Sequence, residues 1–365
     1  MQSSAFDLNF HTLLKNASDL NASDLHIEPY REKVRIRARI DGVLTVIQEI
    51  KNEKYCSRFL MKAKNLCNFD MSKNMEPQDS RFRCEDIPFD LRGSLVPTMH
   101  GEKIVLRFLE RNKNFSIDSY PMPEEARRDL KNILDKWQGL VLVSGPVGSG
   151  KTTLLYSALA SIDLIQNNIH TLEDPIEYEL EGAGQTQVSG AMGFSNGLKY
   201  LLRQDLDVIL VGETRDHETA HTLMHAASTG HLVFSTIHAN SAMECIDRLV
   251  GLGVSKDILE ANLIFASAQR LVPKNCPYCI KEDDESVELV KNLFNEKFIP
   301  KKSEGCPECF QTGIKGRVLL FEYLVKKETE IGGEKKLFLQ GSLKNSALEH
   351  LRKGNISAQN ACAFV

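Results

Sequence analysis

Residues 140–162 read LVLVSGPVGSGKTTLLYSALASI. An apolar run opens this stretch, a loop matching the phosphate-binding pattern G-x-x-x-x-G-K-[ST] follows, and a segment compatible with a helix closes it. The glycines let the loop fold so that successive backbone N–H groups converge on a phosphate, and the start of the helix adds about half a positive charge. A chance glycine-rich turn is the alternative, but it does not explain a strand and a helix in register on either side.

The loop is therefore predicted to bind the phosphates of ATP. Lys151 is expected to reach the β- and γ-phosphates, and the Thr152 hydroxyl is expected to hold Mg²⁺. The predicted contacts to ATP are Gly145, Pro146, Val147, Gly148, Ser149, Gly150, Lys151, Thr152 and Thr153.

Two further apolar runs, at 208–212 and 231–236, follow the loop and alternate with segments of helical pattern. Short runs of this kind are buried on both faces, as the parallel strands of an α/β sheet are. The fold class predicted for this part of the chain is therefore α/β.

Acidic residues follow two of the apolar runs. Glu213 ends the run that starts at Val208, a strand expected next to the phosphate loop, and is chosen to polarise the attacking water. Glu173 opens a second acidic group, 173–177, at a predicted carboxyl edge of the sheet, where open α/β sheets bind ligands. These acids are expected to hold the metal or to orient water, and solvated acids at strand ends are the alternative.

Two histidines flank the run 231–236. His231 and His238 are seven positions apart, so in an extended strand they point to opposite faces, about 23 Å from each other, and do not share a metal. His238 is expected at the phosphate edge, where it senses the γ-phosphate or is simply packed.

The first 112 residues show a different pattern. Residues 34–40 alternate strictly between apolar and basic side chains, a turn at Asp41-Gly42 leads into a second strand, and a helix is expected over about 53–67. The predicted organisation is an α+β domain with an antiparallel sheet over 1–112, a linker over 113–134 and the α/β domain over 135–365.

A hairpin is predicted between the runs 89–96 and 102–109. If Pro97 to Glu102 forms its loop, the register sets Arg92 directly opposite Arg107. Like charges in facing positions are unfavourable unless an anion lies between them. The pair is therefore a candidate anion site, with solvated arginines on a sheet face as the alternative.

Composition sets further limits. The chain of 365 residues has a net charge of -4, with 42% hydrophobic and 26% charged residues, as expected for a globular protein of about two domains. The negative charge argues against a protein that coats nucleic acid. There is no run of about eighteen apolar residues and no basic, apolar signal at the start, so a cytosolic protein is expected.

Four of the nine cysteines have metal-ligand spacing. Cys276, Cys279, Cys306 and Cys309 form two C-x-x-C pairs within an element expected over 274–312. Two such pairs make a closed tetrahedral thiolate site that suits a structural Zn²⁺, and four unligated thiols are the alternative.

Taken together, the motifs resemble the secretion and pilus assembly ATPase superfamily of P-loop proteins. The resemblance rests on SDLHIEP (23–29), QDSRFR (78–83), the phosphate loop, TLEDPIEY (171–178), GQTQV (184–188), LLRQDLDVILVGETRD (201–216), TGHLVFSTIHAN (229–240), CPYC and CPEC. It implies a PAS-like N-terminal domain followed by a RecA-like ATPase domain with a zinc-binding tetracysteine insert.

The resemblance also implies roles for single residues. Glu173 falls in the acidic box, Glu213 in the atypical Walker B motif, and His231 and His238 in the histidine box. Arg203 matches a family arginine, whereas Lys199 stands where many members carry another. Arg92 and Arg107 match arginines that reach a neighbouring subunit's nucleotide.

The function implied is a hexameric ATPase motor that drives assembly of a type II secretion pseudopilus or type IV pilus through a polytopic inner-membrane platform protein. ATP, Mg²⁺ and Zn²⁺ are the expected cofactors, and the expected location is the cytoplasm, peripheral to the inner membrane. Members that bind an inner-membrane recruiter usually use an additional N-terminal domain, so recruitment is expected to differ here, or the chain is a compact or truncated member.

Two alternatives stay open. The first is a pilus retraction or conjugative type IV secretion ATPase, which the tetracysteine element disfavours because retraction motors usually lack it. The second is a nucleic-acid-binding zinc protein, which the net charge and the lack of aromatic stacking motifs disfavour.

Overall fold

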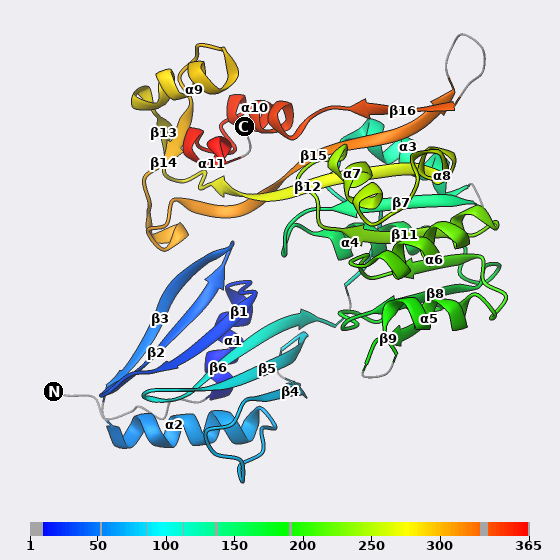
Figure 1. Cartoon of the computed structure of the whole chain (residues 1–365). Coiled ribbons are helices and arrows are strands. Elements are labelled where there is room, and N and C mark those ends of the chain that lie inside the picture. Colours follow the sequence, from blue (N-terminus) through cyan, green and yellow to red (C-terminus); the bar gives the residue numbers. More distant parts are fainter. Residues whose placement is uncertain are drawn as a thin grey trace. The chain divides into compact units, whose positions relative to one another are not determined.

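The computed structural model describes residues 10–51, 53–85, 87–111, 113–135, 138–189, 192–328 and 335–363. The chain divides into two compact units (Figure 1). The first unit comprises Met1–Lys113 and Gly305–Ile314, and the second comprises Asn114–Glu304 and Lys315–Val365.

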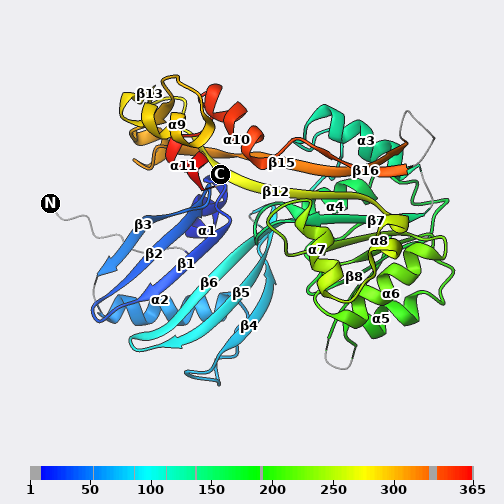
Figure 2. The same ribbon diagram turned by 45° about the horizontal axis from the view of Figure 1, so that its top comes forward.

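The first unit contains a six-stranded antiparallel sheet with the strand order β3-β2-β1-β6-β5-β4. Its strands are β1 (Asp24–Pro29), β2 (Lys33–Ile40), β3 (Val43–Lys51), β4 (Gln78–Arg83), β5 (Phe89–Thr98) and β6 (Gly101–Glu110). Its helices are α1 (Phe10–Asp19) and α2 (Glu53–Leu66), and Figure 2 shows α2 lying along one face of the sheet.

Strict alternation decides the two faces of this sheet. Val34, Ile36 and Ala38 of β2 are buried in a core shared with α1 and α2, while the arginines between them point to the other side. The side away from the helices is called the polar face below, and its cross-strand positions include Asp24, Glu28, Arg39, Arg92 and Arg107.

The predicted hairpin register is confirmed. Arg92 of β5 pairs directly with Arg107 of β6. The same row continues to Asp24 on β1 and Arg39 on β2 on one side, and to Arg81 on β4 on the other. One carboxylate therefore shares a transverse row with four arginines.

The second unit is built on an eight-stranded sheet with the order β16-β15-β12-β7-β11-β10-β8-β9. Its strands are β7 (Gly139–Ser144), β8 (Ile169–Glu173), β9 (Gly184–Gln187), β10 (Val208–Val211), β11 (Leu232–Ile237), β12 (Leu263–Asn275), β15 (Ile314–Glu328) and β16 (Lys335–Gln340). A separate two-stranded sheet joins β13 (Ile280–Glu282) to β14 (Lys301–Ser303). The helices are α3 (Glu124–Leu134), α4 (Lys151–Leu159), α5 (Phe194–Leu201), α6 (His217–Ser228), α7 (Glu244–Gly251), α8 (Lys256–Asn262), α9 (Val287–Phe294), α10 (Leu343–Arg352) and α11 (Ala358–Cys362).

The central strands are parallel and covered on both faces, as their apolar sequences predict. Along β7, Leu140 and Leu142 enter a core with α5, α6, α7 and α8, whereas Val141 and Val143 enter a second core with α3 and α4. Figures 1 and 2 show the two sets of helices on opposite sides of the sheet. All carboxyl ends of these strands consequently meet at one edge.

The structure differs from the sequence-based expectation in two places. The strand leading to Glu213, β10, does not lie next to β7, because β11 is inserted between them. In addition, α3 occupies the second half of the stretch expected as a linker, because Ala126, Leu130 and Ile133 form an apolar stripe that is buried in the core.

None of the described helices combines the length and the apolar character that a membrane-spanning segment requires.

Candidate nucleotide-binding site

The phosphate loop joins the end of β7 to the start of α4. Gly150 caps the helix in the left-handed region, with φ of 90°, and Lys151 is the first helical residue. Gly145 has φ of +147°, and a Cβ there would lie 2.5 Å from both the backbone oxygen of Gln269 and the Oγ of Ser149. Glycine is required at this position because β12 presses against the loop.

Lys151 lies within the loop that it closes. Its Nζ donates to the backbone oxygens of Gly145, at 2.7 Å, and Pro146, at 3.0 Å. Burial lowers the pKa of this ammonium, and the nearby carboxylates of Glu213 and Glu177 act in the opposite direction. Thr152 and Thr153 are half-buried in the first turn of the helix. A cationic group and helix N–H groups thus share one concave segment, which suits a polyphosphate.

Glu213 follows β10 at the same edge of the sheet, and each of its oxygens has a basic partner. Oε1 lies 3.0 Å from Nε2 of His238, just beyond the end of β11, and Oε2 lies 2.5 Å from a terminal nitrogen of Arg215. The carboxylate is 14% exposed, whereas His238 is 50% exposed. Burial by itself would raise the pKa of Glu213, but Arg215, His238 and Lys151 outweigh it and lower that pKa. The group is therefore an ionised acceptor at neutral pH.

Glu173, at the end of β8, has a different environment. It is 5% exposed, and its carboxylate accepts hydrogen bonds from the hydroxyls of Tyr156, at 2.5 Å, and Thr171, at 2.6 Å. The side-chain amide of Gln185 donates to it at 3.3 Å, and burial raises the pKa of the carboxyl group. The hydrogen bonds described for the Glu173 carboxylate thus come from three side chains of the surrounding fold.

The remaining predicted residues of the second unit lie apart from this cluster. His231 precedes β11 at the opposite end of the strand from His238, with its Nδ1 3.0 Å from the backbone oxygen of Ala226. Arg203 is exposed just beyond α5, and Lys199 on that helix pairs with Glu218 of α6. The structure therefore brings together the loop, Glu213 and His238, and leaves His231 at the far edge.

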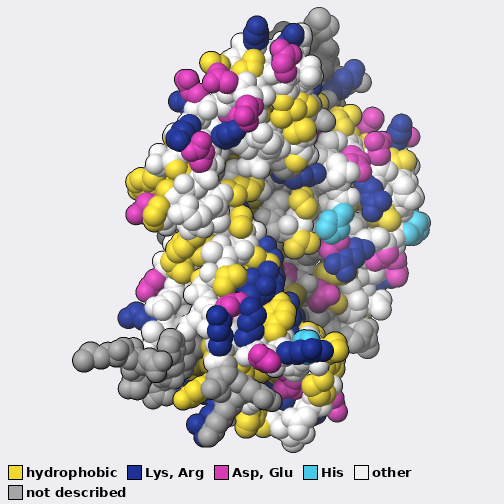
Figure 3. Space-filling view, turned by 90° about the vertical axis from the view of Figure 1, so that its left-hand side faces the viewer, with side chains coloured by type: hydrophobic (Ala, Val, Ile, Leu, Met, Phe, Trp, Pro, Cys, Tyr) yellow, Lys and Arg dark blue, Asp and Glu magenta, His cyan; other side chains and the backbone are white. Residues whose placement is uncertain are grey.

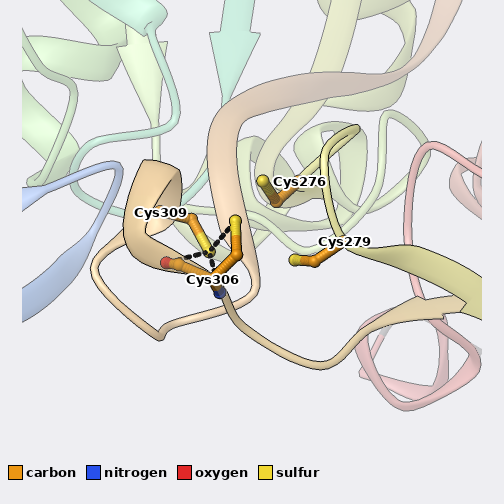
Figure 4. Close-up of side chains that lie close together, drawn as sticks. All are labelled: Cys276, Cys279, Cys306 and Cys309. Atoms are coloured by element: carbon orange, nitrogen blue, oxygen red, sulfur yellow. Dashed lines mark hydrogen bonds between the residues drawn. The ribbon is translucent and has the colours of Figure 1, made fainter.

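The four predicted zinc ligands converge. The Sγ atoms of Cys276, Cys279, Cys306 and Cys309 all lie within 4.8 Å of one another (Figure 4). The backbone N–H groups of Cys306 and Gly313 donate to the Sγ of Cys309 at 3.2 and 3.3 Å, which stabilises a thiolate. Four sulfur donors with this support fit a tetrahedral zinc ion.

The profile of the family described as "Type II/IV secretion system protein" matches residues 4–357. The chain belongs to this family. It is 40% identical over 323 residues to the putative type II secretion system protein E of Escherichia coli (strain K12), covering 86% of this chain and 65% of that protein.

A second family relative is the type II secretion system ATPase E of Vibrio cholerae. It is 37% identical over 324 residues, which cover 86% of this chain and 64% of that protein. The chain thus spans slightly less than two thirds of the length of these two relatives.

Solved structures show the same fold. The Legionella pneumophila ATPase DotB superposes with a TM-score of 0.70 and 21% identity, covering 100% of this chain and 96% of that one. The pilus retraction motor PilT with bound ADP superposes with a TM-score of 0.63 and 24% identity, covering 98% and 97%. The folds of both units are therefore found in these two solved structures as well.

Three residues of this family member were missed by reasoning from the sequence. Arg215 lies two positions beyond Glu213, and an arginine so close to a predicted acidic group was an available signal. Tyr120 and Gln269 had no such signal, because their contacts join distant segments: the Gln269 amide donates to the Tyr120 hydroxyl at 3.0 Å and to the Ser149 oxygen at 2.7 Å. Gln269 is fully buried and supports the phosphate loop from β12.

Proposed function

We propose that this chain is an ATP-hydrolysing motor that drives assembly of a type II secretion pseudopilus or type IV pilus. The observation that carries the proposal is Glu213, an ionised carboxylate held by His238 and Arg215 at the sheet edge that also presents Lys151. Membership of the type II/IV secretion family supports ATP as the substrate, since the Vibrio cholerae relative is named an ATPase and the PilT structure contains ADP.

In this proposal the loop binds ATP and Glu213 activates water. Lys151 and the backbone N–H groups from Gly145 to Gly150 bind the β- and γ-phosphates. Thr152 would hold Mg²⁺, which would neutralise part of the phosphate charge. Glu213 orients the attacking water. His238 holds the Glu213 carboxylate in the orientation that faces this water, and it also senses the γ-phosphate.

The role proposed for Glu173, in the acidic box, follows from its hydrogen bonds. Glu173 accepts hydrogen bonds from Tyr156 of α4 and from Thr171 of its own strand, β8. We infer that Glu173 supports catalysis indirectly, by holding the sheet edge in place for the acidic segment 174–177. Glu213 is the acid that acts at the γ-phosphate.

The first unit, over about 1–112, completes the site of a neighbouring subunit. Arg92 and Arg107 face each other on the polar face, an arrangement that is favourable with an anion between them. A hexameric ring, in which each first unit serves the next subunit's ATP, is the assembly proposed. Arg203 contributes a further positive charge from the second unit, and His231 supports the far end of the histidine-box strand.

Zinc has a structural role in this proposal. Two C-x-x-C pairs leave no open coordination position, so the ion holds the segments before and after α9 together. The motor is proposed to act from the cytoplasm on a polytopic inner-membrane platform protein, peripheral to that membrane, with an inner-membrane recruiter as a possible further partner.

ATP turnover by the purified, oligomeric chain with Mg²⁺ tests the proposal. Lys151→Ala is expected to remove turnover, whereas Lys256→Ala, at an exposed lysine on α8, leaves it unchanged. Absence of ATP hydrolysis by the oligomer, or a normal rate for Lys151→Ala, contradicts the proposed motor. Binding of the platform protein's cytoplasmic part, with stimulation of turnover, separates an assembly motor from other ATPases.

A further inference from the structure

Asp24 lies between Arg39 and Arg107 in the transverse row of arginines on the polar face of the first unit. It lies on β1, paired with Arg39 of β2 on one side and with Arg107 of β6 on the other. Its Oδ1 accepts a hydrogen bond from Nε of Arg107 at 2.9 Å, and its Oδ2 accepts one from the Ser23 hydroxyl at 2.8 Å. Nε of Arg39 is 3.9 Å from Oδ2. Arg107 is therefore the basic partner most directly bound to Asp24.

The two partners differ sharply in exposure. The Asp24 side chain is 9% exposed and that of Arg107 is 60% exposed. A guanidinium has five N–H donors, of which Nε carries one. Within the described residues, Nε is the atom of Arg107 for which a hydrogen bond is found. The contact thus anchors the base of the planar group and leaves the outer pair of nitrogens facing solvent.

This geometry suits phosphate recognition. Two parallel N–H groups on the terminal nitrogens bind phosphate oxygens bidentately, and the strength of that contact depends on the orientation of the guanidinium plane. An anchor at Nε sets this plane before the ligand arrives, which reduces the ordering cost of binding.

Repulsion between the arginines of this row is a further reason for an anchor on Arg107. Arg92 lies directly opposite Arg107, and Arg81 lies opposite Arg92. Facing arginines repel one another, so Arg107 without Asp24 is pushed away from Arg92. Figure 3 shows Lys and Arg side chains gathered in the lower central part of the view, with fewer acidic ones among them.

We propose that Asp24 is a positioning residue, which orients Arg107 for the γ-phosphate of the ATP bound by the adjacent subunit. The inference rests on the proposed function and deepens it, because it assigns a part in hydrolysis to Asp24, one of the two acidic residues of the SDLHIEP segment. In this proposal Asp24 binds Arg107, and Arg107 in turn contacts the nucleotide.

Glu28 provides a matched control on the same strand and the same face. Its Oε1 is bound by Arg37, at 2.6 Å, and Lys103, at 3.0 Å, and its Oε2 by Arg35, at 3.1 Å. Both oxygens are thus engaged with cations other than Arg107. Neutralising Glu28 changes the charge of the sheet without releasing Arg107.

The test compares steady-state ATP hydrolysis, with Mg²⁺, by oligomers of this chain and of its variants. Asp24→Asn is expected to lower kcat about tenfold, the worth of weakening one charge-assisted hydrogen bond in the transition state, with KM for ATP changed less than about twofold. Glu28→Gln is expected to lower the melting temperature at unchanged kcat. In the Arg107→Ala background, Asp24→Asn is expected to add no further loss, because Asp24 acts through Arg107.

Asp24→Glu keeps the charge but moves it by one methylene, so it serves as the second variant and is expected to fold and to lose kcat at unchanged KM. Wild-type kcat in both Asp24 variants, while Arg107→Ala is impaired, overturns the positioning role and leaves the proposed function standing. An equal additional loss from Asp24→Asn in the Arg107→Ala background also overturns it. Full turnover by Arg107→Ala removes the trans role of Arg107 and the positioning role together.

Discussion

Nε2 of His238 lies 3.0 Å from Oε1 of Glu213. The histidine comes from the end of β11 and the acid from the end of β10, so neighbouring parallel strands bring the pair together. The lowered pKa of Glu213 makes it a weak base. Its role in the proposed reaction is therefore to orient and polarise the attacking water from a fixed position. Removing a proton from that water before the phosphate is attacked would require a stronger base.

Glu213→Gln is expected to lower kcat for ATP by about 10² to 10³, because an amide keeps the shape but loses the negative charge that polarises water. Binding of a nonhydrolysable ATP analogue, measured by fluorescence, is expected to change less than about threefold. Glu218→Gln, at an exposed acid on the following helix, is the matched control. Comparable turnover in Glu213→Gln and the wild type contradicts the assignment.

Arg92→Ala and Arg107→Ala are each expected to reduce ATP turnover at least about tenfold while nucleotide binding is retained, because the arginines act on developing phosphate charge. If they act across subunits, mixing Arg107→Ala with Lys151→Ala protomers restores part of the activity in mixed rings. Full turnover in both arginine variants rejects the role, and the absence of recovery on mixing rejects its action between subunits.

Glu28 is expected to make the first unit sensitive to acid. Burial by itself would raise its pKa, but the hydrogen bonds from Arg37 and Lys103 outweigh burial and lower the pKa from 4.5 to about 2. Because the pKa is lower in the folded state, the stabilisation is complete above pH 4.5 and is lost as the pH falls from 4.5 to about 2.

Urea unfolding of wild type and Glu28→Gln checks this dependence. At pH 7 the variant is expected to be less stable by about 3 kcal/mol. The difference is expected to shrink toward pH 2.5, measured as a difference so that other titrating acids cancel. A difference that stays constant over this pH range shows that the carboxylate charge of Glu28 is not the cause.

Protein purified without chelator is expected to contain one zinc ion per chain, measured by mass spectrometry of the metal. Cys279→Ser is expected to lose the zinc and about 3 kcal/mol of stability, because three ligands do not close the tetrahedral site. Cys362→Ser, at an exposed cysteine outside the cluster, is expected to keep both. Absence of stoichiometric zinc from the wild type rejects a metal at this site.

Much of the architecture was predictable because it depends on local periodicity. The alternation over 34–40 predicted β2 and its buried face, and the apolar runs before the loop and before Glu213 predicted β7 and β10. The register of Arg92 and Arg107 followed from the length of one hairpin loop. Each of these features is encoded within about twenty residues of the chain.

Other features were not predictable from local patterns. The insertion of β11 between β7 and β10 depends on how the crossovers are wound, and apolar runs do not encode strand order. The burial of Glu173 depends on Tyr156 and Gln185, which come from two other elements. An apolar run that ends in an acid does not show whether that acid is buried in the fold or lies at the open edge of the sheet.

The sequence by itself determined the phosphate loop, the alternating sheet of the first unit and the four thiols of the zinc site, since spacing and residue type specify each of them. The tertiary structure alone decided that His238 binds Glu213, and which arginine is anchored by Asp24. The physical reason is that hydrogen bonds between side chains act over about 3 Å, and only folding brings residues so far apart in the chain within that distance.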